Sequence, residues 1–176
     1  MSDLRPLSLP PANINQMTET PQIQTTPPQP LAIIHLTIPR SEMRTVIGPA
    51  LSELHATIAA QGLAITGPWL THHLRMVPDI FDFEICLPVS APVTPAGRVI
   101  SGEIPAMTAA HAVFTGNYSG LGAAWSELGT WLAEAANANG LKPATDLWEC
   151  YLAGPESNPD PAAWRTELIR PLTPAS

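Results

Sequence analysis

Basic residues are scarce in this chain of 176 residues, and they are scattered along it. It has 8 Lys and Arg against 15 Asp and Glu, which gives a formal net charge of −7. A nucleic-acid-binding surface needs clustered Lys and Arg to neutralise phosphates. We therefore expect this chain to make no direct contact with nucleic acid.

Cysteines and long apolar runs are also few. Cys86 and Cys150 lie in apolar runs and are expected to be buried thiols, since nothing points to the oxidising compartment that a disulfide needs. No apolar run reaches the ~20 residues that span a bilayer, and the N-terminus lacks the pattern of a signal peptide. We expect a cytoplasmic protein without a membrane partner.

The signatures of metal and cofactor sites are missing. There is no His-Glu-x-x-His and no Cys-x-x-Cys. His72 and His73 are neighbours in a predicted strand, so they point to opposite faces and cannot share an ion. The run Ser119-Gly120-Leu121-Gly122 is too short for a phosphate loop, and no Gly-x-Ser-x-Gly nucleophile elbow occurs. We expect no metal and no cofactor.

The composition is that of a globular domain behind a polar tail. Hydrophobic residues make up 45% of the chain and charged residues 13%. Residues 1–20, rich in Pro, Thr, Gln and Asn, are predicted to be a disordered tail. The run PQIQTT at 21–26 can form a first edge strand. One folded domain is expected over residues 21–173.

Within that domain the sequence repeats, with the first unit over about 31–93 and the second over about 96–173. Ser52-Glu53-Leu54 matches Ser126-Glu127-Leu128, and Gly62-Leu63 matches Gly140-Leu141. The distance between these anchors is four residues longer in the second unit, which predicts one extra helical turn there.

Each unit reads as strand, helix, strand and strand. Apolar residues recur at three- and four-residue steps over 42–61 and over 119–139, which predicts two amphipathic helices, the first with a kink at Pro49. Ser41 and Ser119 are the expected N-caps, and Gly62 and Gly140 the expected C′ residues. Strand-like runs lie at 31–38, 68–75, 81–88, 98–104, 108–115, 146–153 and 164–170.

The predicted fold is α+β, with two tandem modules related by pseudo-twofold symmetry. Their strands form an antiparallel sheet with the helices on one side and a central groove between the modules. In the repeat, Glu149 is equivalent to Thr71, and Tyr151 is equivalent to His73. Side chains alternate along a strand, so Glu149 and Tyr151 share a face, and Trp148 and Cys150 share the other.

Glu149 is the most unusual residue, because it interrupts the apolar strand Asp146-Leu147-Trp148-Glu149-Cys150-Tyr151-Leu152. One interpretation is structural: a glutamate that faces solvent or is held by hydrogen bonds. The other is a carboxylate in an aromatic pocket that attracts cationic ligands. Tyr118, Tyr151, Trp69, Trp148 and His73 are the other candidate pocket residues, whereas Trp125 is expected in the core. Glu84 and Glu167, equivalent in the repeat, could add a second carboxylate.

The closing pattern of the chain resembles the GyrI-like small-molecule-binding family, the bacterial transcription-activator effector-binding domain. The pattern is Trp148-Glu149-Cys150-Tyr151-Leu152, Gly154-Pro155, Pro159-Asp160-Pro161, Thr166-Glu167-Leu168 and Pro171-Leu172. The resemblance implies tandem strand–helix–strand–strand modules and a cleft for hydrophobic, often cationic or aromatic compounds. It also implies that Glu149 is the principal polar group there, with Tyr151 beside it. His73 departs from it, since many members have tyrosine there.

The resemblance implies a stand-alone sensor, sequestering or regulatory protein for lipophilic, including multidrug-type, compounds. No helix-turn-helix precedes the domain, so an effect on a transcription regulator or on gyrase would be exerted in trans. An alternative is a hydrolase of strained or toxic small molecules, in which Glu149 activates water and Tyr151 orients the leaving group. A third class is a protein-interaction module, which would not depend on Glu149.

Overall fold

The computed structural model describes residues 19–176, so most of the expected tail at 1–20 lies outside the described residues. The helices and strands follow one another as β1 (Gln22–Thr26), β2 (Gln29–Pro39), η1 (Arg40–Glu42), α1 (Met43–Ala60), β3 (Leu70–Val77), β4 (Ile80–Pro88), β5 (Ile100–Ile104), β6 (Met107–Thr115), η2 (Tyr118–Gly120), α2 (Leu121–Ala138), β7 (Leu141–Pro143), β8 (Leu147–Ala153), η3 (Pro161–Ala163) and β9 (Arg165–Pro174).

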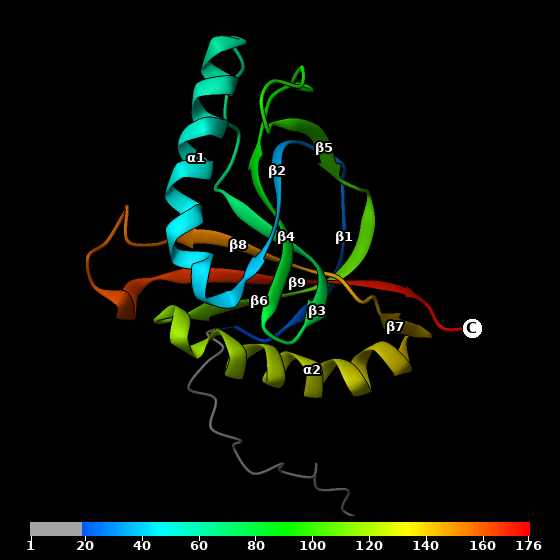
Figure 1. Cartoon of the computed structure of the whole chain (residues 1–176). Coiled ribbons are helices and arrows are strands. Elements are labelled where there is room, and N and C mark those ends of the chain that lie inside the picture. The colour runs from blue at the N-terminus through cyan, green and yellow to red at the C-terminus, as the bar shows by residue number, and fades with distance from the viewer. Residues whose placement is uncertain (1–18) are drawn as a thin grey trace, which may run out of the picture.

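All the strands join one antiparallel sheet in the order β1-β6-β9-β8-β3-β4-β2-β5, with β7 paired to β9. The two predicted modules are β2-α1-β3-β4 and β6-α2-β8-β9. They meet at the centre, where β3 pairs with β8, and the strand order runs outward in the same way on either side (Figure 1). The α+β fold with two tandem modules is confirmed.

The register places the pseudo-twofold axis at one residue pair. Thr71 of β3 lies directly opposite Glu149 of β8, and these two positions are also the ones that the repeat makes equivalent. A residue and its own equivalent can face each other in this way only at the symmetry axis. Glu149 therefore stands at the centre of the sheet, where the two modules join.

Both helices cover the face of the sheet that carries Glu149. The residues of α1 and α2 buried against the sheet recur every fourth position, as one face of a helix requires: Ala50, Leu54 and Ile58 in α1, and Ala124, Leu128, Leu132 and Ala136 in α2. Phe83 of β4 is opposite His73, and Leu168 of β9 is opposite Glu149, and these belong to the two cores under the helices. The opposite face buries a third cluster around Leu31, Leu70 and Trp148.

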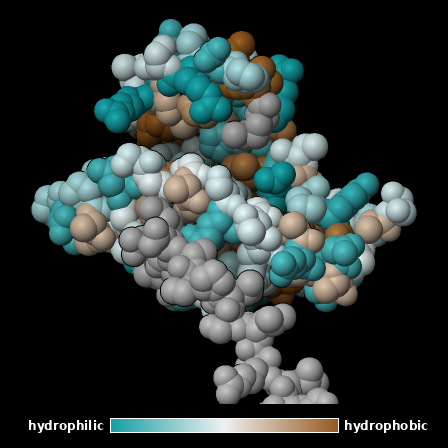
Figure 2. Space-filling model, turned by 90° about the horizontal axis from the view of Figure 1, so that it is seen from below, coloured by the Kyte–Doolittle hydropathy of each residue, from teal (hydrophilic) through white to brown (hydrophobic). Residues whose placement is uncertain are grey.

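The face of the molecule seen from below is mixed in character. Hydrophilic and weakly apolar residues are interspersed on it, and strongly hydrophobic residues show at small, separate places (Figure 2). None of the helices in the described part of the chain has the length and hydrophobicity needed to cross a membrane.

Two local predictions are wrong, one strand was missed, and two predictions are confirmed. Both α1 and α2 have 18 residues, so the second helix contains no extra turn, and a constant offset of 78 relates the modules from η1 to β3. The serines are not the helix caps: a 3-10 turn precedes each helix, and the Asn117 side chain caps the second turn by accepting from Ser119 N. β7 was not predicted. Gly62 and Gly140 follow the helices with φ of 67° and 66°, and PQIQTT supplies β1.

Candidate functional site

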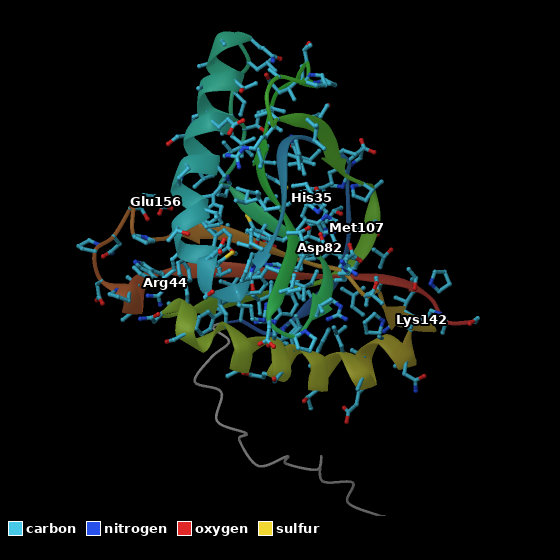
Figure 3. All side chains as sticks on the ribbon, viewed as in Figure 1. His35, Arg44, Asp82, Met107, Lys142 and Glu156 are labelled. Atoms are coloured by element: carbon cyan, nitrogen blue, oxygen red, sulfur yellow. The ribbon has the colours of Figure 1, made fainter. Side chains whose placement is uncertain are left out.

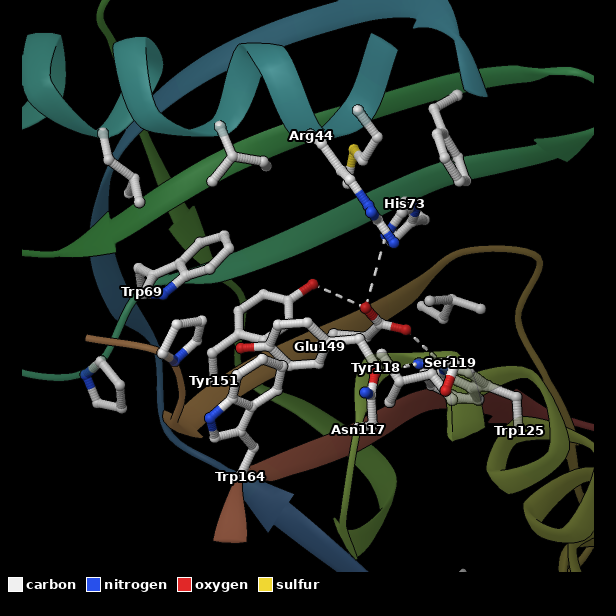
Figure 4. A pocket seen from close by; sticks show the side chains of 18 of the residues that line it. Arg44, Trp69, His73, Asn117, Tyr118, Ser119, Trp125, Glu149, Tyr151 and Trp164 are labelled. Atoms are coloured by element: carbon white, nitrogen blue, oxygen red, sulfur yellow. Dashed lines mark hydrogen bonds and ion pairs between the residues drawn. The ribbon is translucent and has the colours of Figure 1, made fainter. Parts of the chain in front are cut away.

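A cavity of about 1570 Å³ opens between the two helices, on the face of the sheet that they cover. Strands β3 and β8 form its base, η1, α1 and the start of α2 form two sides, and the segment after β8 closes a third (Figure 4). The cavity therefore lies across the pseudo-twofold axis, and each module contributes to it.

Glu149 lies at the base of the cavity and is only 9% exposed. Its Oε1 accepts a hydrogen bond of 2.7 Å from Trp125 Nε1, and its Oε2 accepts one of 2.7 Å from Tyr151 Oη. Among the residues that the structure describes, no Lys or Arg pairs with it, and the nearest basic atom is His73 Nε2 at 4.0 Å. The carboxylate is thus hydrogen-bonded by neutral donors, and its negative charge has no cationic partner among them unless His73 is protonated.

A chain of hydrogen bonds extends from Glu149 toward β3. Tyr151 Oη lies 2.9 Å from Thr71 Oγ1, which lies 3.2 Å from His73 Nε2. A carboxylate can only accept, so Tyr151 donates to Glu149, Thr71 donates to Tyr151, and the Nε2–H of His73 donates to Thr71. Burial lowers the pKa of His73, with smaller contributions from the charges of His72 and Arg40, although Glu149 opposes them. His73 is therefore neutral near pH 7 and does not neutralise Glu149.

Both tyrosines of the cavity stay protonated. Burial and the charge of Glu149 raise the pKa of Tyr151 well above its usual value. Burial, Glu156 and Glu149 raise the pKa of Tyr118 to about 12. The Tyr118 hydroxyl is buried without a hydrogen-bond partner among the described residues, and it approaches Gly154 so closely that a Cβ there would lie 2.7 Å from it.

Stacked rings form one wall of the cavity. Trp69 stacks on Tyr151 with centroids 4.0 Å apart and planes at 22°. Tyr118 packs edge-on against Tyr151 at 5.7 Å and tilts against Trp164 at 4.7 Å. Trp164 is held in place because its Nε1 donates to Asn158 O at 2.8 Å. The electron-rich faces of such rings favour aromatic and cationic ligands.

The structure brings five of the six predicted ligand-binding residues to this cavity: Glu149, Tyr151, Tyr118, Trp69 and His73. Trp148 is the exception, and its assignment as a wall of the pocket is wrong. It is 2% exposed and belongs to the core cluster on the opposite face of the sheet, as strand alternation requires. Glu84 and Glu167 also lie on that opposite face, since they pair with His72 and Cys150.

Two tryptophans of the cavity were missed from the sequence. Trp125 lies on the apolar stripe of α2, which is why a core position was expected; it does pack against the core under α2, but it also borders the cavity, because the start of that helix lies at the cavity wall. Trp164 is the first residue of the strand-like run 164–170 and directly precedes β9, and nothing in that run distinguishes it as a residue of the cavity. Only the proximity of these segments to Glu149 in space identifies both residues.

Trp148 and His72 form a separate arrangement on the far face. Their rings stack at 3.7 Å, His72 Nε2 lies 2.7 Å from Asp146 Oδ2, and His72 Nδ1 lies 3.8 Å from Glu84 Oε2. Burial lowers the pKa of His72, but its contacts with Asp146 and Glu84 outweigh burial, and the net shift is upward. The two histidines therefore have opposite shifts, consistent with their opposite faces.

This arrangement predicts a pH-dependent contribution to stability. Because the folded pKa of His72 exceeds its ordinary value of 6.5, the stabilisation is complete below that value and is lost as pH rises through the folded pKa. We expect His72→Gln to lower the free energy of unfolding more at about pH 5.5 than at about pH 8.5. Urea unfolding at both pH values measures this, and an equal loss at both would contradict it.

Metal ligation finds no support in the described residues, where no group of three His, Cys, Asp or Glu side chains is placed to hold an ion. The two cysteines are buried and free, as expected. The chemistry available at the cavity is thus that of a buried carboxylate, Glu149, and an exposed one, Glu156, together with hydrogen-bonding groups, arginines at its sides and aromatic surfaces.

Known structures share this fold. The C-terminal domain of EcmrR has 24% identity and a TM-score of 0.77, covering 90% of this chain and all of that one. EcmrR in its complex with DNA has 23% identity and a TM-score of 0.75, and the match covers 89% of this chain and 58% of that chain. A hydrolase from Listeria innocua has 14% identity and a TM-score of 0.61, and the match covers 87% of this chain and 91% of that chain. SAV2435 bound to tetraphenylphosphonium has 11% identity and a TM-score of 0.54, and the match covers 88% of this chain and 94% of that chain.

The cavity and the tandem modules define a small-molecule-binding domain. The family model described as the GyrI-like small molecule binding domain matches residues 19–173. The chain belongs to this family, as the resemblance of its closing pattern predicted. Comparison with curated proteins gives no match.

Proposed function

We propose that this protein binds lipophilic compounds that carry a positive charge or a strong hydrogen-bond donor, with Glu149 as their anionic partner. The observation that supports this most is the state of Glu149: it is buried at the base of an aromatic cavity, and within residues 19–176 its hydrogen-bond donors are the neutral groups of Trp125 and Tyr151. A bound cation would supply the missing opposite charge where water is largely excluded and attraction is strong.

The aromatic surfaces supply the rest of the affinity. Trp69, Tyr151, Tyr118 and Trp164 present stacked and tilted rings beside the carboxylate. Each ring face adds roughly 0.5–2 kcal/mol of cation–π attraction to a suitably placed cation. By binding such compounds the protein would act as a sensor or a sequestering protein.

The competing hydrolase hypothesis assigns Tyr151 to the leaving group. In the structure the Tyr151 hydroxyl already donates to Glu149 and contacts Thr71, so its proton is engaged before any ligand arrives. This favours binding over hydrolysis.

The test is a tryptophan-fluorescence titration with two ions of nearly the same shape and opposite charge. SAV2435, of similar fold, is bound to tetraphenylphosphonium, which makes this cation the first probe, with tetraphenylborate as its anionic counterpart. We expect saturable quenching by the phosphonium, with an affinity at least about tenfold higher than for the borate, because a buried carboxylate repels the anion. Equal affinity would contradict the proposal.

Incubating the protein with lipophilic esters and epoxides tests whether it is a hydrolase or only a binding protein. Mass spectrometry should recover each compound unchanged. Products that carry one added water, in more than one equivalent per protein, would show an enzyme instead.

A further inference from the structure

Equivalent positions of the two modules line the cavity in pairs, but they carry different chemistry. With the constant offset of 78 residues, the second module places its carboxylate and two donors where the first has uncharged groups. Pairs that line the cavity include Ile47 with Trp125, His73 with Tyr151, Trp69 with Leu147 and Arg40 with Tyr118. Glu149 lines it as well, whereas its equivalent Thr71 is fully buried and is not among the lining residues. The cavity is therefore symmetric in backbone and asymmetric in charge.

The two arginines that line the cavity beside α1, Arg40 and Arg44, both belong to the first module. Arg40 of η1 lies over the Phe81 ring at 4.4 Å, and Arg44 of α1 lines the cavity one turn further along. Their equivalents in the second module are Tyr118 and Gly122. Within the described part of the chain, Arg44 makes no hydrogen bond or ion pair, and Figure 4 shows it extending from α1 toward the cavity that contains Glu149.

The acidic groups come from the other side. Glu149 is on β8 and Glu156 is in the segment that follows it, and both line the cavity. Figure 3 shows Arg44 and Glu156 at the same side of the molecule, with Lys142 at the opposite side. Arg170 also lines the cavity, but its guanidinium already has partners: its Nε donates to Ala144 O at 2.9 Å, and the negative charge of Asp146 attracts it.

This distribution differs from that of the whole chain. The protein carries a formal charge of −7, yet its cavity is lined by three arginines and two glutamates, a formal excess of one positive charge. A site that selected ligands only for positive charge would gain nothing from arginines at its wall, because they repel a cation. Their presence indicates that the ligand also carries an acceptor or a negative charge.

We propose that the preferred ligand is amphoteric: an aromatic compound with a positive or donating group at Glu149 and a carboxylate, sulfonate or phosphate facing Arg44 and Arg40. This rests on the proposed function and specifies its ligand class. A guanidinium binds such oxyanions through two parallel hydrogen bonds, which adds orientation to the charge attraction. The two charged groups together fix which end of the ligand enters each module.

The test compares rhodamine B, an aromatic cation with a free carboxylate, with its ethyl ester, which keeps the cation and lacks the negative charge. Fluorescence anisotropy measures the dissociation constants of both dyes. We expect rhodamine B to bind about three- to fivefold more tightly than the ester at low salt, and the difference to shrink in high salt, since Arg44 is exposed. An ester that binds as tightly as rhodamine B would overturn this inference and leave the proposed function intact.

Substitutions of Arg44 test whether this residue causes the preference for rhodamine B over its ester. Arg44→Gln should remove most of the difference between the dyes, and Arg44→Lys should retain most of it. Arg98→Gln is the control for total charge, because Arg98 bonds Glu53 and does not line the cavity. A preference that survives Arg44→Gln, or that Arg98→Gln removes equally, would overturn the assignment. If neither dye binds the wild-type protein saturably, both this inference and the proposed function fail.

Discussion

Replacing Glu149 with glutamine should weaken the binding of tetraphenylphosphonium by about 2–4 kcal/mol, which is roughly 30- to 1,000-fold in dissociation constant. The carboxylate lies at the base of the cavity and is largely buried, and glutamine removes its charge while keeping its shape. Fluorescence titration of both proteins, confirmed by calorimetry, measures the difference.

The same substitution should leave the fold almost unchanged, to within about 1 kcal/mol, because the hydrogen-bond chain can reverse. The glutamine oxygen can still accept from Trp125, and its amide can donate to the Tyr151 oxygen. Tyr151 can then donate to Thr71, and Thr71 to the Nε2 of His73, which changes tautomer. Every group keeps a partner, so thermal unfolding should show a nearly unaltered midpoint.

Glu156→Gln is the matched control. It is the same chemical change in the same cavity, but Glu156 is exposed to solvent, where charge interactions are weak. We expect its effect on the affinity for the cation to be less than about tenfold. Equal losses from the two variants would assign the affinity to the general field of the cavity and refute a special role of Glu149.

Tyr151→Phe should have the opposite effects to Glu149→Gln: it should lower the stability of the fold and leave the affinity for the cation unreduced. Phenylalanine keeps the ring that stacks on Trp69 but removes the donor to Glu149 Oε2, at a site that is only 6% exposed. A buried carboxylate oxygen that loses its donor costs about 1–3 kcal/mol in the free energy of unfolding. Urea unfolding measures this loss.

The affinity of Tyr151→Phe distinguishes two roles of the hydroxyl. If it only supports Glu149, the less stabilised carboxylate should bind tetraphenylphosphonium as tightly as in the wild type or more tightly. Thr71→Val, which removes the next hydroxyl in the chain, serves as the control, because Thr71 is fully buried and separated from the cavity by Tyr151 and His73. A loss of affinity above about tenfold in Tyr151→Phe alone would show that the hydroxyl contacts the ligand itself.

The fold was largely predictable because its signals are local and repeated. Buried residues at every fourth position mark both helices, and Gly62 and Gly140 end them with positive φ. Alternation in β8 correctly separated Glu149 and Tyr151 from Cys150. The mistakes concern matters that local patterns do not fix: the Ser-Glu-Leu match suggested a longer second helix, although any shift of four residues keeps the same buried face.

The site was predictable only where a residue was unusual for its own element. A glutamate in an apolar strand is such a residue, and Glu149 lies at the base of the cavity. Trp125 fits an apolar helix stripe and Trp164 begins an ordinary strand-like run, so neither could be recognised as a neighbour of the carboxylate or of Tyr118. Trp148 drew attention because it is large and aromatic, but its strand position places it on the other face.

The sequence by itself determined two similar modules, their helices and strands, and which face of β8 each side chain takes, because periodicity and turn residues act over a few positions. The tertiary structure decided what meets at the axis. Pairing of β3 with β8 brings Thr71, His73, Tyr151 and Glu149 into one hydrogen-bonded chain, and the packing of α2 adds Trp125. Long-range strand pairing and helix packing, which no local pattern encodes, thus produced a carboxylate held by neutral donors among aromatic rings.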